Sequence, residues 1–247
     1  MQAPESGRRV LRVRHELVRR DVTVAAVQPL GPHFTSITFA GEALGGFVSA
    51  SFDDHVKFVF QGADGEPVLR DYTPRRFDRE RRELTIEFVL HDSHGQDGAS
   101  EWARNARAGQ RAVIAGPRGS MIVPTDYDWH LLAGDASALP AIHRRLEELP
   151  ASTRAIVLMQ VADVADRRAI ASRAGLEVQW VASPDEWIAT LRALPLPEGS
   201  GYVWCAAEAS MIAKAREIVL VDKGHPREDA KLAAYWKQGA ADYHEDH

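Results

Sequence analysis

The sequence predicts two domains, an antiparallel β-barrel followed by an α/β domain built on a parallel sheet. The length of 247 residues fits two ordinary domains. Residues 20–126 alternate apolar and polar side chains in short runs, which is typical of antiparallel strands. Residues 127–247 instead alternate continuous apolar runs with helical patterns, which indicates βαβ units. The pattern of apolar and polar residues changes near Pro124-Thr125-Asp126, where we place the domain boundary.

The first domain is predicted from five period-two strands and one helix. The strands are expected at residues 22–24, 34–39, 55–60, 84–90 and 111–114. Turn residues such as Gly62-Ala63-Asp64-Gly65 separate them. The helix is expected from Ser100 to Ala108, because Gly109 follows it and helices often end before a glycine.

The second domain is predicted from apolar runs that alternate with helices. The runs at 130–133, 155–161, 176–181 and 201–206 are expected to be strands buried on both faces. The helices are expected at 138–149, 184–194 and 209–221. This alternation predicts a parallel sheet wound in βαβ units, followed by a C-terminal extension.

The composition excludes several functional classes. The formal charge of −5 and the isoelectric point near 6.1 argue against broad nucleic-acid binding. No stretch approaches the ~20 apolar residues of a membrane span, and residues 1–20 lack the apolar core of a signal peptide, so we expect a cytoplasmic protein. The single cysteine, Cys205, cannot form an intrachain disulfide or hold an iron–sulfur cluster alone. Any redox chemistry would therefore need an organic cofactor.

The most informative segment is Arg70-Asp71-Tyr72-Thr73-Pro74-Arg75-Arg76. At the end of a strand, the alternation of side chains lets the Tyr72 ring lie along a planar ligand while Arg70 reaches a phosphate. Thr73 can then offer its hydroxyl to the edge of the ligand. This arrangement suits a flavin, and the alternative interpretation is a basic loop between two strands.

A second segment, Gly98-Ala99-Ser100, lies between a predicted strand and a predicted helix. The backbone N–H groups at a helix start are unsatisfied and carry partial positive charge. Small residues let a phosphate approach that backbone, so the segment is a candidate seat for a pyrophosphate. The alternative is that Ser100 only caps its own helix.

Three further segments fit a ligand cleft, although each is weak by itself. The run from Gly116 to Ser120 predicts a tight turn that presents Arg118. Residues 131–142 describe a buried strand ending at Gly134 and a helix after it, which is where open α/β sheets bind ligands. Lys237 follows two aromatic residues near the chain end, where a packed strand with a solvated lysine is the alternative.

Taken together, these segments resemble the siderophore-interacting proteins, which are FAD-dependent ferric-siderophore reductases of the ferredoxin-reductase-like superfamily. The resemblance covers residues from about Val22 to Asp246 and rests on six motifs in the order of that family. The motifs are Arg70-x-Tyr72-Thr73-x-Arg75, a histidine at the end of the next strand, Gly98-Ala99-Ser100-x-Trp102, Gly116-Pro117-Arg118-Gly119, Gly134-Asp135-x-x-Ala138-Leu139-Pro140-Ala141-Ile142 and Tyr235-Trp236-Lys237-x-Gly239.

The resemblance implies a flavin-binding barrel followed by a domain of the NAD(P)H-binding type. It implies that Arg70 contacts the FAD pyrophosphate, that Tyr72 stacks near the isoalloxazine and that Thr73 lies close to its reactive edge. The remaining FAD-binding residues that it implies are His91, Gly98, Ala99 and Ser100. This chain lacks the proline that the family commonly carries at the start of the helix, and its preceding loop is longer, so the identity of the phosphate donors stays open.

The implied reaction transfers electrons from a donor through FAD to siderophore-bound iron(III) and frees iron(II) in the cytoplasm. Many ferric siderophores are anionic, and local cations can attract them against the net charge of the chain. The resemblance supports Lys57, Arg118 and Lys237 as these cations, and the alternative for each is a solvated surface charge.

The donor is NADH, NADPH or reduced ferredoxin, and the sequence does not distinguish them. The candidate NAD(P)H-binding residues are Asp135, Ser137, Ala138 and Glu208, which lie at predicted strand ends. No general acid, general base or resident metal is predicted, and the histidines of the acidic tail at 242–247 are interpreted as solvated.

Two other functions fit the same sequence. One is a general flavoprotein like ferredoxin–NADP reductase that serves a protein partner. The other is a siderophore-binding protein without a flavin. The oligomeric state is left open.

Overall fold

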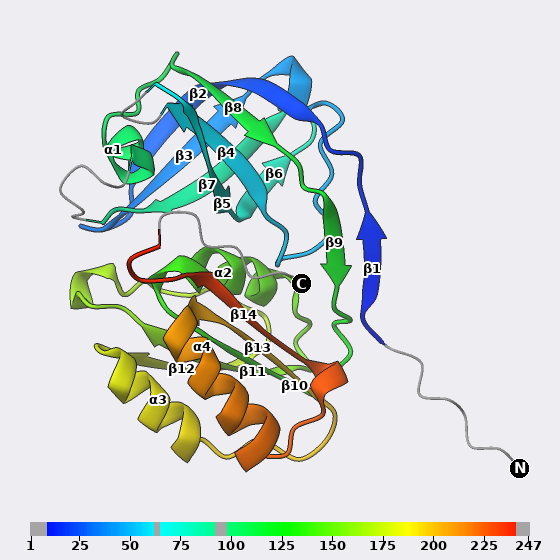
Figure 1. The fold of residues 1–247 in the computed structure, drawn as a ribbon. Helices are drawn as coiled ribbons and strands as arrows, with labels where there is room; N and C mark the ends of the chain where they lie inside the picture. The colour runs from blue at the N-terminus through cyan, green and yellow to red at the C-terminus, as the bar shows by residue number, and fades with distance from the viewer. Residues whose placement is uncertain (1–8, 62–64, 92–97, 241–247) are drawn as a thin grey trace, which may run out of the picture.

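A computed structural model describes residues 9–61, 65–91 and 98–240, and it divides them between a curled β-sheet domain and an α/β domain (Figure 1). The first sheet has seven antiparallel strands in the order β5-β4-β8-β2-β3-β7-β6. Its strands are β2 (Arg19–Pro29), β3 (Phe34–Ala40), β4 (Val56–Gln61), β5 (Pro67–Tyr72), β6 (Pro74–Asp78), β7 (Glu83–Val89) and β8 (Arg111–Ala115). Helix α1 (Gly98–Arg104) packs beside β4, β3 and β7.

The seven-stranded sheet curls because its two edge strands are neighbours in the chain. Strands β5 and β6 lie at opposite ends of the strand order, yet only Thr73 separates them in sequence. Across this seam the Tyr72 ring of β5 lies 4.4 Å from the Phe88 ring of β7. The prediction of an antiparallel, barrel-like first domain is therefore confirmed, and the Arg70–Arg76 motif forms the seam of the curled sheet.

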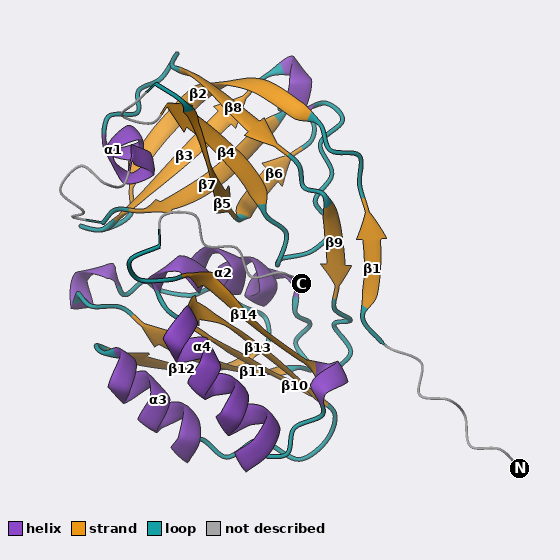
Figure 2. Cartoon of the chain, in the orientation of Figure 1, coloured by secondary structure: helices purple, strands orange, loops and turns teal. Residues whose placement is uncertain are grey.

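The second domain contains a five-stranded parallel sheet in the order β12-β11-β10-β13-β14. Helix α2 covers one face, on the side of the first domain, while α3 and α4 cover the other (Figure 2). The strands are β10 (Trp129–Gly134), β11 (Arg154–Gln160), β12 (Gly175–Val181), β13 (Gly201–Glu208) and β14 (Ala230–Trp236). The helices are α2 (Leu139–Glu148), α3 (Pro184–Ala193), α4 (Ala209–Arg216), the π-helix η4 (Glu217–Asp222) and the 3₁₀ turns η1 (Glu42–Leu44), η2 (Ala136–Ala138), η3 (Val164–Asp166) and η5 (Arg227–Asp229). The predicted parallel α/β domain is confirmed.

A two-stranded ribbon beside both domains was not predicted. Strand β9 (Gly119–Ile122) follows the last strand of the first domain and pairs with β1 (Leu11–Arg14) near the chain start. All four β1 side chains are exposed, although the four residues alternate apolar and polar. Strand β9 ends at Ile122 and β10 begins at Trp129. The connection between them contains Pro124-Thr125-Asp126, where the pattern of apolar and polar residues changes.

Two details of the prediction are corrected by local physics. Helix α1 ends at Arg104 and not at Ala108. The Asn105 backbone N–H is shared between the Glu101 and Trp102 carbonyls (3.2 Å each), and the Asn105 side-chain amide also donates to the Glu101 carbonyl (3.0 Å). The prediction that residues 176–181 are buried on both faces is wrong. Strand β12 lies at the edge of its sheet, and its side chains alternate between exposed and half-buried up to Trp180, while Val181 is buried. Among the described residues, no helix is both long and apolar enough to cross a bilayer.

Candidate flavin and substrate cleft

The seam motif places three predicted residues side by side at the end of β5. Arg70 and Tyr72 are two positions apart on a strand, so their side chains share one face of the sheet. The Tyr72 ring is half-buried against Phe88, and its edge meets Phe58 at 6.1 Å between ring centroids. Thr73 follows and is buried. Aromatic packing against Phe58 and Phe88 therefore fixes the Tyr72 ring, while the Arg70 side chain stays half-buried.

Phe60 connects Arg70 to the start of helix α1. The Arg70 guanidinium carbon lies 5.9 Å from the centroid of the Phe60 ring, on the neighbouring strand β4. A Cβ placed on Gly98 would lie 2.6 Å from Cε2 of the same ring, so only a glycine lets the helix start pack this closely. These contacts bring a cation and a helix start around one ring. We refer to Arg70, Phe60 and Gly98 as the cradle.

Ser100 uses its hydroxyl to hold helix α1 to the end of β7. The hydroxyl donates to the Val89 carbonyl (3.2 Å) and accepts from the His91 backbone N–H (3.1 Å). Ser100 is 2% exposed and Ala99 is buried, whereas Gly98 is half-buried. The serine therefore positions the helix start, and Gly98 is the residue of this trio with accessible surface.

The two domains meet where His91 faces the end of β14. The exposed His91 ring lies 6.3 Å from the Trp236 ring, which the second domain contributes. Trp236 is 41% exposed, and its indole N–H donates to the Asp135 carboxylate at 2.8 Å. Residues 92–97, between His91 and α1, lie outside the described part of the chain. The cradle and the last strand of the α/β domain thus border the same inter-domain region.

The predicted NAD(P)H residues gather at the carboxyl edge of the parallel sheet, where they bind one another. Asp135 accepts from the Ser137 backbone N–H (2.9 Å), the Ser137 hydroxyl (2.5 Å) and the Glu208 backbone N–H (2.9 Å). Burial raises the pKa of Asp135 although these donors favour its ionised form. Glu208 caps α4 through the Ser210 backbone N–H (2.6 Å). Ala138 is completely buried, so it offers no surface to a ligand in this structure.

The three predicted substrate cations come from three elements. Lys57 lies on β4, forms an ion pair with Asp71 (2.7 Å) and stands opposite Ala115 in the sheet. Arg118 is exposed three residues beyond Ala115, in the turn that leads to β9. Lys237 is exposed directly after β14. Strand register therefore brings the Lys57 and Arg118 segments together, and β14 supplies the third cation from the other domain.

Arg75, which the sequence motif includes, ties the domains together. Its guanidinium donates two hydrogen bonds to the Glu147 carboxylate (2.9 and 2.7 Å) on α2. It also lies 3.3 Å from the Glu87 carboxylate, which Arg168 of the second domain contacts at 2.9 Å. Paired guanidinium–carboxylate contacts of this kind fix orientation as well as distance. The seam of the curled sheet is thereby fastened to helix α2.

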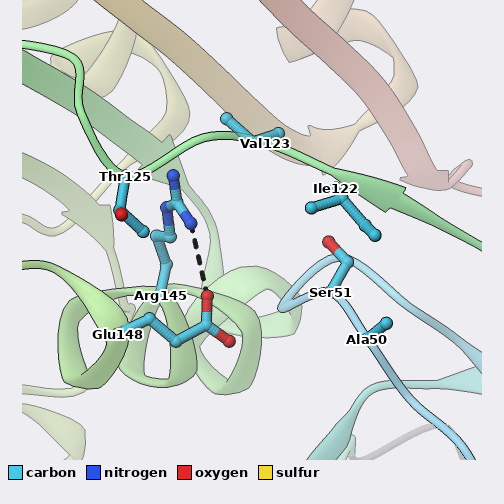
Figure 3. A pocket seen from close by; sticks show the side chains of 7 residues that line it. All are labelled: Ala50, Ser51, Ile122, Val123, Thr125, Arg145 and Glu148. Atoms are coloured by element: carbon cyan, nitrogen blue, oxygen red, sulfur yellow. Dashed lines mark hydrogen bonds and ion pairs between the residues drawn. The ribbon is translucent and has the colours of Figure 1, made fainter. Parts of the chain in front are cut away.

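A small cavity of about 230 Å³ lies at the joint between the domains (Figure 3). Arg145 points along its wall and donates to Glu148 (3.3 Å) and to the Pro124 carbonyl (2.5 Å). Burial lowers the pKa of this guanidinium and raises that of Glu148. The residues that line the cavity are Ala50, Ser51, Ile122, Val123, Thr125, Arg145 and Glu148, and none of them is a predicted ligand residue.

Two residues of this region, Phe60 and Trp236, were not predicted from the sequence, because their role depends on long-range contacts. Phe60 lay in a predicted strand as an ordinary core residue, and its period-two position alone did not indicate the cradle. Trp236 lay in a motif from which only Lys237 was selected. The sequence signal for Trp236 is its place directly before Lys237.

Comparison with known proteins identifies the family. Residues 127–239 match the family model described as siderophore-interacting protein. Residues 23–67 and 62–121 match the model described as siderophore-interacting FAD-binding domain. The parallel-sheet domain and the curled sheet that carries the cradle therefore each match a module of the same kind of protein.

Individual relatives agree with these matches. An Escherichia coli (strain K12) protein named NADPH-dependent ferric-chelate reductase is 33% identical, over 91% of this chain and 95% of its own length. Ferric vibriobactin reductase ViuB of Vibrio cholerae is 30% identical, over 85% of this chain and 87% of its own. A crystal structure of a siderophore utilization protein from T. fusca superposes with a TM-score of 0.87 at 32% identity, covering 94% of this chain and 97% of that one. The chain belongs to the siderophore-interacting protein family.

Proposed function

We propose that this protein is an FAD-dependent oxidoreductase that reduces siderophore-bound iron(III) to iron(II). The observation that carries the proposal is the cradle, in which Arg70 and the start of α1 converge on Phe60 within the domain that matches an FAD-binding model. The names of the Escherichia coli and Vibrio cholerae relatives, both ferric reductases, support the substrate class.

The described residues fit FAD at the cradle. A guanidinium and a helix start with a glycine are the groups that recognise a pyrophosphate, so Arg70 and the Gly98–Ala99 backbone are the proposed phosphate ligands. Ser100 holds that backbone in place through Val89 and His91. Tyr72 and Thr73 are proposed to border the isoalloxazine, and His91 is proposed to line the FAD site. When bound, FAD accepts two electrons as a hydride and can pass them on singly.

The proposed substrate is an anionic ferric siderophore held by Lys57, Arg118 and Lys237. Hard siderophore oxygens bind iron(III) far better than iron(II), so one electron weakens the complex without breaking the ligand. The protein supplies cations that attract and orient the anion, and such local charge acts against a net charge of −5. We place this reaction in the cytoplasm, where reduced nicotinamide nucleotides are available.

The proposed donor is NADPH, on the name of the Escherichia coli relative. One hydride carries two electrons, so NADPH and two ferric complexes yield NADP⁺, two ferrous ions and one proton. Ser137 and Glu208 border the strand ends where a nucleotide would enter, but their hydrogen bonds within the chain must be shared or exchanged on binding. NADH and reduced ferredoxin are the alternative donors.

The test compares donors on the purified protein. We expect a yellow protein with non-covalent FAD that reduces a ferric siderophore with NADPH faster than with NADH or reduced ferredoxin, measured with a ferrous chelator. A colourless protein that binds ferric siderophores would support the flavin-free binding function instead. Fast reduction of generic dyes without preference for ferric chelates would support a general electron carrier.

A further inference from the structure

Two adjacent buried aspartates lie between the domains. Asp53 and Asp54 are 5% and 2% exposed, and only His55 separates them from strand β4. Buried carboxylates are costly unless charged or hydrogen-bonding partners compensate them. The partners of these two residues therefore indicate what the pair holds together.

Asp53 holds strands β13 and β14 of the second domain. One carboxylate oxygen accepts from the Trp204 indole (3.0 Å) and from the Tyr235 hydroxyl (3.3 Å). The other oxygen forms an ion pair with Lys231. Lys231 and Tyr235 are four positions apart on β14, so both project from the same face of the strand. Asp53 thus anchors β14 along its length, up to two residues before Lys237.

Asp54 holds strand β9 of the ribbon. One of its oxygens accepts from the Ser120 hydroxyl (2.8 Å), the Ser49 hydroxyl (2.8 Å) and the Ser51 backbone N–H (3.1 Å). Ser120 lies two residues after Arg118, near the start of β9. The chain itself continues from Asp54 into β4, which carries Lys57. The two carboxylates therefore connect the three segments that bear the proposed substrate cations.

We propose that Asp53 and Asp54 are positioning residues that fix Lys57, Arg118 and Lys237 relative to one another and so set the affinity for anionic ferric siderophores. The inference rests on the proposed function. The negative charge of an aspartate near a binding site for anions opposes their binding. A structural role is therefore needed to explain why two aspartates are buried near this site. Anchoring cations from two domains at fixed separations supplies that reason, because charge complementarity depends on geometry.

The test uses two opposite effects of Asp53 on the KM for an anionic complex. Its negative charge raises this KM, whereas its anchoring of the cations lowers it. Asp53→Asn removes one negative charge and Asp53→Ala removes the anchor as well. If charge alone mattered, both would lower the KM for an anionic complex. Positioning predicts the reverse: KM for iron(III) tris-catecholate rises about tenfold in Asp53→Ala and less in Asp53→Asn, which keeps an acceptor for Trp204 and Tyr235. We expect kcat and FAD content to stay within about twofold of wild type.

Two controls separate positioning from general loosening of the domains. Glu147→Gln makes the same charge change in another inter-domain contact, with Arg75, and should leave KM within about twofold of wild type. The neutral iron(III) tris-acetohydroxamate complex should show little change in KM for Asp53→Ala, because it does not depend on the cations. A KM for the tris-catecholate that falls, stays unchanged or rises equally in Glu147→Gln would overturn the inference. A wild-type protein without flavin-dependent ferric reduction would instead refute the proposed function.

Discussion

Gly98→Ala tests the cradle, because the structure gives the size of the steric conflict. The added methyl carbon would lie 2.6 Å from Cε2 and 3.2 Å from Cδ2 of Phe60. Attractive carbon–carbon contacts begin at about 3.5 Å, so the ring or the helix start must move by roughly 0.9 Å. Overpacking of this kind costs about 1–3 kcal/mol, while the higher helix propensity of alanine returns up to about 1 kcal/mol. The net effect on the free energy of unfolding is therefore small, about 0–2 kcal/mol.

The effect on FAD affinity should exceed the effect on stability. A helix start displaced from Phe60 no longer shares one site with Arg70, so we expect the FAD dissociation constant to rise about tenfold, or about 1.4 kcal/mol. The assay is calorimetric titration of the deflavinated protein with FAD. Gly46→Ala is the matched control, since a Cβ there meets no atom within 4 Å and FAD affinity should not change.

A double-mutant cycle decides whether the Phe60 ring is the cause. In a Phe60→Leu background the ring atoms that meet the new methyl group are absent, so Gly98→Ala should change FAD affinity by less than about twofold. Equal weakening of FAD binding by Gly98→Ala in both backgrounds would show that the Phe60 ring is not the cause. A single variant that binds FAD as tightly as wild type would show that the cradle does not hold FAD.

Further predictions concern the substrate cations and acid stability. Lys57→Ala, Arg118→Ala and Lys237→Ala should each raise the KM for an anionic ferric siderophore by about threefold to tenfold with unchanged flavin content, and loss of flavin would show that the site is misplaced. Burial, with Arg145 nearby, lowers the pKa of His130 to about 3. The unfolded chain binds this proton below about pH 6.5 and the folded chain does not, so stability falls as pH drops from 6.5 towards 3. At pH 5 the loss is about 2 kcal/mol, and His130→Gln should remove it relative to pH 7 in urea unfolding; an unchanged pH dependence would contradict the assignment.

The sequence predicted those parts of the fold that repeat a local pattern. Alternation located β3, β4 and β7, and continuous apolar runs located β10, β11 and β13, because each pattern reflects burial on one or two faces. Strand β1 was not predicted, because its alternation covers only the four residues Leu11-Arg12-Val13-Arg14. Strands β5 and β6 lie at the sheet edges, where polar residues replace a clear alternation.

The candidate site also has one part that the sequence indicated and one part that only the fold reveals. The charge of Arg70 and the ring of Tyr72 indicated a ligand from residue chemistry alone. The contacts of Asp53 join residues 151, 178 and 182 positions apart, so no sequence window contains them. Strands β5, β6 and β7 separate Phe60 from Gly98 in the chain, so only the fold brings these two residues together.

The most direct test of the central claim is an anaerobic single turnover. Photoreduced protein is mixed with an excess of ferric siderophore, while absorbance follows flavin reoxidation and a ferrous chelator traps the iron. We expect two ferrous ions to appear for each flavin reoxidised, at a rate that depends on the ferric siderophore concentration. Flavin that stays reduced in the presence of catecholate, hydroxamate and mixed-ligand complexes would contradict it.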